Sequence, residues 1–159
     1  SKNFDKTKCY LANDNSNGQV ILSGKNSDLD IFSENLKKNK IKNIKLPVSA
    51  PFHCELMRSA TEQMRKEITN VEFKKPEINI ISNVTARQTN NPKDIKELLI
   101  EQIEKPVRWR EIVINMIESK VDKFIEIGPG KVLSGLVKRI NSNVELIQVN
   151  EIEDINKLN

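Results

Sequence analysis

The chain contains a single group suited to proton transfer near neutral pH, because His53 is its only histidine. His53 lies in the segment Leu46-Pro-Val-Ser-Ala-Pro-Phe-His-Cys-Glu-Leu-Met57, where a predicted strand gives way to a predicted helix. Pro51 restricts the backbone before it, and the positive end of the following helix dipole favours the neutral imidazole that a general base requires. These features indicate acid–base catalysis, and a purely structural role for a lone histidine remains the alternative.

The two cysteines indicate no second chemistry. Cys54 follows His53 directly, but neighbouring side chains on a helix diverge by roughly 100°, which favours a packed thiol over a Cys–His dyad. Cys9 and Cys54 are too few for a disulfide framework and suit a reducing compartment. Their spacing with His53 matches no compact zinc site, so we predict that the chain binds no metal.

A Gly-Pro-Gly turn at residues 128–130 follows a predicted strand and precedes a predicted helix. A dinucleotide-binding fingerprint would need a third glycine at position 133, which is Leu133. Pro129 also removes a backbone donor from the turn. The sequence therefore predicts a structural turn here, and no nucleotide site.

Composition limits the classes of partner. The 159 residues carry a net charge of +4, with lysines spread along the chain, which fits either a solvated basic surface or an acidic partner. Aromatic residues make up only 4% and no arginine-rich block is present, which argues against nucleic acid. No apolar run reaches membrane-spanning length. We expect a cytoplasmic protein without membrane or nucleic-acid partners.

The first part of the chain resembles most of a ferredoxin-like α+β unit that lacks its first strand and helix. Hydrophobic patterning and turn residues predict strands at 8–12 and 19–23 around a turn at 13–18, a helix from 28 to 38, and a third strand at 41–48. We place the boundary of this partial subdomain after residue 48, which gives units of residues 1–48 and 49–159.

The second part alternates helices and strands, which predicts an α/β core with a mostly parallel sheet and helices on both faces. The expected elements are a helix at 54–70, a strand at 78–82 that continues through 83–86, helices at 94–104 and 106–119, a strand at 123–127, a helix ending near 139 and a strand at 145–149.

Five segments in order are similar to motifs of the malonyl-CoA:acyl carrier protein transacylases, within the acyltransferase family. They are Asn13-Asp-Asn-Ser-Asn-Gly-Gln-Val-Ile-Leu-Ser-Gly24, the His53 segment, Ser82-Asn-Val-Thr-Ala86, Gln102 followed by Pro106-Val-Arg-Trp109, and Glu126-Ile-Gly-Pro-Gly-Lys-Val-Leu-Ser-Gly135. The resemblance implies an α/β fold, with a partial parallel-sheet acyltransferase core and an incomplete ferredoxin-like α+β subdomain.

The same resemblance implies transfer of malonyl from CoA, through a seryl ester, to the phosphopantetheine thiol of acyl carrier protein in fatty-acid biosynthesis. His53 matches the family's base, and Gln102 matches the residue whose backbone carbonyl orients it, so substitution of the Gln102 side chain alone should be mild. Phe52 matches a position where a bulky ring accompanies malonyl. Asn13 and Asn15 match asparagines near the active-site cleft. Malonyl-CoA is a substrate, and no cofactor is expected.

One part of the family pattern is absent. The sequence contains no Gly-x-Ser-x-Gly elbow. The resemblance also implies a malonate-binding arginine downstream of that elbow, in a segment that has no counterpart here. The chain therefore corresponds to the C-terminal part of the family domain and is expected to be inactive alone. The alternative is a non-catalytic or split-gene fragment that docks acyl carrier protein or complements an N-terminal chain. Because acyl carrier protein is typically acidic, the basic surface suits it.

Overall fold

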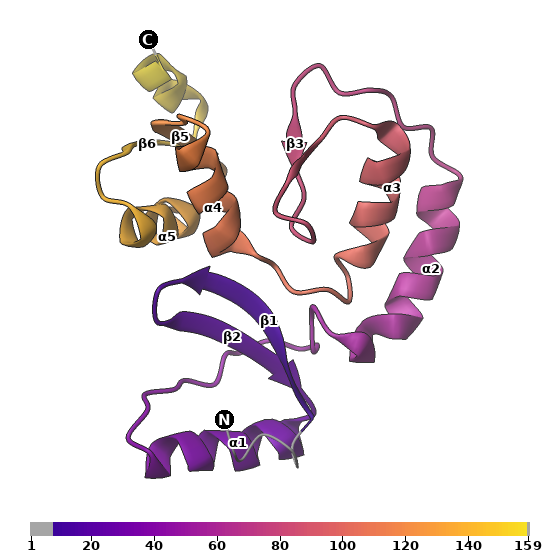
Figure 1. The fold of residues 1–159 in the computed structure, drawn as a ribbon, viewed down its shortest axis with the longest axis vertical. Helices are drawn as coiled ribbons and strands as arrows, with labels where there is room; N and C mark the ends of the chain where they lie inside the picture. Colours follow the sequence, from indigo (N-terminus) through magenta and orange to yellow (C-terminus); the bar gives the residue numbers. More distant parts are fainter. Residues whose placement is uncertain (1–7, 159) are drawn as a thin grey trace.

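The computed structural model describes residues 8–158, which form three small sheets joined by helices (Figure 1). The elements in chain order are β1 (Cys9–Ser16), β2 (Gln19–Gly24), α1 (Asn26–Lys38), the 3₁₀ helix η1 (Glu55–Met57), α2 (Arg58–Thr69), β3 (Ile80–Ile81), β4 (Gln88–Thr89), α3 (Pro92–Glu101), α4 (Trp109–Glu118), β5 (Lys123–Ile127), α5 (Val132–Ile140), β6 (Glu145–Val149) and the 3₁₀ helix η2 (Ile152–Leu158).

Strands β1 and β2 form an antiparallel hairpin. Ser16 pairs with Gln19, so the connection is only Asn17-Gly18, and Gly18 takes the positive φ of 75° that such two-residue turns require. The predicted turn at 13–18 was therefore too long, because β1 continues to Ser16. Helix α1 packs against this hairpin and buries Phe32.

The predicted third strand at 41–48 is wrong. The hairpin sheet has two strands among the described residues, and 41–48 forms no strand but is bonded to α1, through Asn43 to Ser33 and Lys45 to Asp30. Its apolar side chains stay exposed, with Ile44 at 75% and Val48 at 62%. The alternating pattern is suited to a strand, but a strand also needs a neighbour to satisfy its backbone. The ferredoxin-like subdomain is therefore even less complete than expected.

The parallel sheet is confirmed at β5 and β6, whose residues match the predicted ranges 123–127 and 145–149 and pair in parallel. Helix α5 contacts both strands. Glu126 points toward α5, and the alternation of a strand places Ile125 and Ile127 on the other face. These two are 45% and 78% exposed, so the predicted helical cover of both faces is incomplete in the described residues.

Three predicted elements near the middle of the chain differ from the structure in kind or position. Residues 83–86 form a turn instead of a strand, because Ser82 accepts the N–H groups of Val84 and Ala86. The helix predicted from Pro106 begins only at Trp109, because Val107 exchanges backbone hydrogen bonds with β1. The helix predicted at 94–104 runs over 92–101, with Asn91 capping its first turn.

The most deeply buried large side chains are Ile100 of α3 and Val113 of α4, both 0% exposed. Helix α3 packs against α2, whereas α4 packs against β1 and α5. None of the described helices combines the length and apolarity needed to cross a bilayer. Across residues 8–158 no three acidic, cysteine or histidine side chains gather as a metal site would require. Because α3 and α4 are both anchored in the core by these buried side chains, the two ends of the intervening segment 102–108 are fixed.

Glu126 caps the N-terminus of α5 from inside the parallel sheet. Its carboxylate accepts the Oγ–H of Ser134 at 2.6 Å and the N–H groups of Leu133 and Ser134 at 3.0 and 2.8 Å. Burial alone would raise the pKa of Glu126, but these donors outweigh it and the pKa lies below its usual value. Glu126 therefore stabilises the fold above its unfolded pKa of about 4.3, and this contribution is lost as pH falls through the lower folded pKa.

We expect Glu126→Gln to cost about 1 kcal/mol of unfolding free energy at pH 7, the scale of a lost helix cap. The penalty should shrink as the pH is lowered below about 4, where the native carboxyl also becomes neutral. Urea unfolding at pH 7 and pH 3 measures both values, with Glu72→Gln as an exposed control. A penalty that is equal at the two pH values would contradict this account.

Candidate active site

His53 occupies an uncommon backbone conformation, with φ of 62° in the left-handed region. The helix predicted to begin at this residue does not: Cys54 is extended, η1 begins at Glu55 and α2 at Arg58. The predicted effect of a helix dipole on the His53 ring is therefore wrong, because no helix begins at this residue. A strained backbone at one residue persists only where surrounding contacts hold it.

Two carbonyls just beyond the end of α3 hold His53. Its backbone N–H donates to the carbonyl of Ile103 at 3.2 Å, and its ring Nδ1 lies 2.8 Å from the carbonyl oxygen of Gln102. Carbonyls near a helix C-terminus have no partners within the helix, so they are free to accept these bonds. The structure thus brings His53 and Gln102 together, although they are 49 residues apart.

This contact determines which ring nitrogen of His53 carries the hydrogen in the neutral form. A carbonyl oxygen can only accept, so Nδ1 must carry the hydrogen, and the lone pair of the neutral imidazole lies on Nε2. The same Nδ1–H bond persists when Nε2 takes up a proton, because Nδ1 carries hydrogen in both forms. The half-buried ring is therefore fixed in the tautomer that a general base needs.

The residues on either side of His53 are fixed by separate bonds. The carbonyl of Phe52 accepts a hydrogen bond from the hydroxyl of Ser23 at 2.6 Å, while Phe52 itself is 47% exposed. Cys54 is 2% exposed and its thiol donates to the carbonyl of Pro51, which confirms the prediction of a packed cysteine. Sequence reasoning missed the role of Ser23, although Ser23 lies in one of the quoted motifs.

Tyr10 of β1 links the hairpin to η1, because its hydroxyl donates to the carboxylate of Glu55. This hydrogen bond, with a smaller effect of desolvation, raises the pKa of Tyr10 to about 12. The tyrosine therefore stays neutral and remains a donor at any pH near neutrality. The contact joins β1 to the segment immediately after His53.

Asn13 and Asn15 lie on β1, where Asn13 follows one irregularity in the strand register and Asn15 lies within a second. Asn13 forms an isolated parallel bridge with Val107, and Asn15 is buried, with 9% of its surface exposed. In the described part of the chain, no side-chain hydrogen bond joins either asparagine to His53. The structure thus places this strand beside the segment that follows Gln102.

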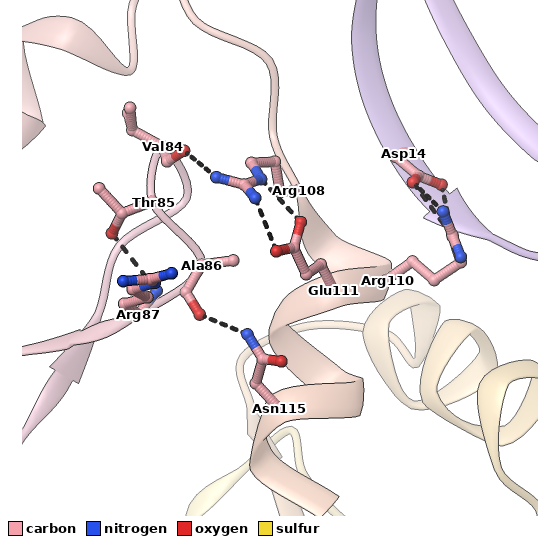
Figure 2. Close-up of polar contacts among 9 residues, drawn as sticks. All are labelled: Asp14, Val84, Thr85, Ala86, Arg87, Arg108, Arg110, Glu111 and Asn115. Atoms are coloured by element: carbon pink, nitrogen blue, oxygen red, sulfur yellow. Dashed lines mark hydrogen bonds and ion pairs between the residues drawn. The ribbon is translucent and has the colours of Figure 1, made fainter. Parts of the chain in front are cut away.

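The turn at 82–86 contacts the candidate site through Asn83, whose carboxamide donates to Gln102 Oε1 at 3.1 Å. Helix α4 and its N-cap residue Arg108 hold the same turn, as Figure 2 shows: Arg108 donates to the Val84 carbonyl and Asn115 to the Ala86 carbonyl. Sequence reasoning quoted this motif but assigned it no role. The sequence feature that could have indicated a role is the pair Ser82-Asn83 directly after β3, because such pairs are typical of turns with side-chain hydrogen bonds.

Helix α4 is in turn tied to β1 by an ion pair. Arg110 binds the carboxylate of Asp14 with its Nε and Nη2, at 2.7 to 3.1 Å (Figure 2). Hydrogen bonding and charge attraction from Asp14 raise the pKa of Arg110 further above its usual value. Hairpin, turn and helix therefore form one connected frame around residues 102–108.

A family model for the acyl transferase domain matches residues 2–154, nearly the whole chain. The chain belongs to the acyl transferase domain family. A malonyl CoA-acyl carrier protein transacylase of Bacillus subtilis is 44% identical over 146 residues, which cover 91% of this chain and 46% of that protein. The chain thus spans about half the length of the curated relatives it matches.

Solved acyltransferases share the fold. An acyl-carrier-protein-S-malonyltransferase from Bartonella henselae superposes with a TM-score of 0.90 at 36% identity, over 94% of this chain and 48% of that one. A malonyl-transacylase solved in complex with its type II PKS acyl-carrier protein also gives 0.90, at 31% identity, over 96% and 50%. The predicted fold class, a partial acyltransferase core with an incomplete small subdomain, is confirmed.

Proposed function

We propose that this chain supplies the general base of a malonyl-CoA:acyl carrier protein transacylase of cytoplasmic fatty-acid biosynthesis. The observation that carries the proposal is the bond from His53 Nδ1–H to the Gln102 carbonyl, which leaves Nε2 able to accept a proton. In serine hydrolases a buried carboxylate orients the base. Here a backbone carbonyl takes that role, so Gln102 contributes through its main chain.

The proposed reaction has two half-reactions. Nε2 of His53 takes the proton of a serine hydroxyl as the serine oxygen attacks the thioester carbonyl of malonyl-CoA, and it returns that proton to the departing CoA thiolate. The imidazole then takes the proton of the phosphopantetheine thiol, whose sulfur attacks the seryl ester. The serine oxygen leaves with the proton from Nε2, and malonyl remains on acyl carrier protein.

Phe52, Asn13 and Asn15 complete the proposed substrate side. The exposed Phe52 ring beside the base would leave little room for an α-methyl group, which favours malonyl. Asn13 and Asn15 would line the cleft from β1. Malonyl-CoA and acyl carrier protein are the proposed partners, without a cofactor, and the net charge of +4 suits an acidic carrier protein.

The serine must come from another segment, because the sequence has no Gly-x-Ser-x-Gly. We propose that the chain is the C-terminal part of the enzyme and that an N-terminal part completes it. Within the chain, the proposed boundary between the small subdomain and the core lies near residue 48. The exposed apolar residues of 41–48 and the open face of β5, with Ile127 at 78% exposure, support this view. Parallel sheets are normally covered on both faces.

Complementation tests this proposal. The purified chain alone should transfer no malonyl above background, whereas mixing it with the unmatched half of the Bacillus subtilis relative should restore transfer to acyl carrier protein. The control is the same half with its elbow serine replaced by alanine. Transfer by the chain alone would contradict the assigned role. A stable complex that binds acyl carrier protein without any transfer would favour the alternative, a non-catalytic docking fragment.

A further inference from the structure

We propose that Asn83 is a positioning residue for His53, on the premise of the proposed function that His53 is the base. Asn83 does not touch the imidazole. It acts through Gln102, whose backbone carbonyl holds the ring and whose side chain Asn83 holds. Gln102 thus connects Asn83, in the turn after β3, to the ring of His53, whose tautomer the Gln102 carbonyl selects.

The first step is the position of the Gln102 carbonyl beyond the end of α3. Gln102 is the C-cap residue of α3, where its backbone N–H donates to the carbonyl of Leu98, and the chain then runs on to Val107, which pairs with β1. The orientation of a peptide unit at such a helix end is not fixed by the helix ladder itself. A bond to the Gln102 side chain therefore restricts the residue that presents the carbonyl.

The second step is that Asn83 is itself fixed. Its backbone carbonyl accepts the N–H of Arg108 at 3.2 Å, and the next carbonyl, that of Val84, accepts the Arg108 guanidinium at 3.0 Å. Glu111, one turn along α4, accepts the Nε and Nη2 donors of the same guanidinium (Figure 2). Because Arg108 bonds to the carbonyls of both Asn83 and Val84, the position of Asn83 depends on the start of α4. The bond from Asn83 to the Gln102 side chain extends this dependence to Gln102.

The third step is that His53 donates two separate hydrogen bonds to the residues just after α3. The ring bonds to Gln102 and the backbone N–H bonds to Ile103. Rotation of the Gln102 peptide would weaken the ring contact while leaving the Ile103 contact in place. The expected consequence of losing Asn83 is therefore a redistribution of the ring tautomers in a chain that stays folded.

NMR of the chain labelled with ¹⁵N-histidine tests this directly, because the sole imidazole gives one set of ring signals. We expect Asn83→Ala to lower the ratio of Nδ1–H to Nε2–H tautomer roughly threefold to tenfold, the range for loss of one intramolecular hydrogen bond. Gln102→Met keeps the carbonyl, removes Oε1 and should cause the same fall. The double variant should fall no further, because both changes break one contact.

Asn83→Asp is the rescue variant. The Gln102 carboxamide can turn over and donate its Nε2–H to the new carboxylate, so the ratio should return to within about twofold of the original. Asn79→Ala is the matched control, because it breaks an equivalent Asn–Gln contact, to Gln88, on the same β3–β4 hairpin. This control should leave the tautomer ratio unchanged.

An unchanged ratio in folded Asn83→Ala would overturn the positioning role. If that variant does not fold, an unchanged ratio in Gln102→Met would overturn it instead. The measurement needs no substrate and no second chain. Failure of malonyl transfer would therefore contradict the proposed function without affecting this result, and an unchanged tautomer ratio would leave the proposed base in place.

Discussion

Replacing His53 with asparagine is expected to lower malonyl transfer by the complemented enzyme by about 10²- to 10⁴-fold, the usual contribution of a positioned general base. Asparagine is the appropriate replacement because it tolerates the left-handed backbone, here with φ of 62°, better than other side chains. The loss should therefore reflect the missing Nε2 and not a distorted loop. The measurement is the rate of malonyl transfer to acyl carrier protein at saturating concentrations of both chains.

Lys40→Asn is the matched control for this substitution. Lys40 is also a non-glycine residue in the left-handed region, with φ of 59°, and it is exposed at the end of α1. Both variants should unfold in urea at the midpoint of the unsubstituted chain. Full transfer activity in the folded His53→Asn variant would show that another group is the base, because no second imidazole exists in this chain.

Elements that depend on local sequence were predictable. β5 and β6 matched their predicted residues because five consecutive positions of suitable composition are bounded by turn residues on both sides. Asn17-Gly18 encodes its own hairpin turn. The prediction failed where the outcome depends on a distant partner: 41–48 has the pattern of a strand without a neighbour, and Pro106 was read as a helix start because the pairing of Val107 with β1 cannot be seen locally.

The candidate site shows the same division. His53 could be singled out from its type alone, and Gln102 only through the family resemblance, because the 49 residues between them hide their contact. Ser23 and Asn83 act through bonds to residues 29 and 19 positions away, so no local pattern assigns them a role. His53 has a left-handed backbone where it bonds to the carbonyls of Gln102 and Ile103, whereas the residues from Cys54 onward had predicted a helix there.

Ile100→Ala is expected to be the most damaging core substitution near the site, with a loss of about 2–5 kcal/mol in unfolding free energy. Ile100 is 0% exposed on the last turn of α3, and its carbonyl accepts the N–H of Ile103. The substitution removes buried methylene and methyl groups and leaves a cavity beneath the turn that presents both His53-binding carbonyls. Such a loss is a large fraction of the stability of a typical domain.

Urea unfolding measures this loss, and Leu99→Ala is the natural control, because Leu99 is the neighbouring residue on α3 but is 37% exposed. It should cost about 1 kcal/mol or less, and Ile100→Val should fall between the two at about 0.5–1.5 kcal/mol. Equal costs at positions 99 and 100 would contradict the packing described for α3. Because the Gln102 and Ile103 carbonyls depend on this turn, Ile100→Ala should also weaken the Nδ1–H bond of His53 in the fraction that remains folded, whereas Leu99→Ala should not. The stability of α3 and the tautomer of His53 are thus expected to change together, since both depend on the same helix end.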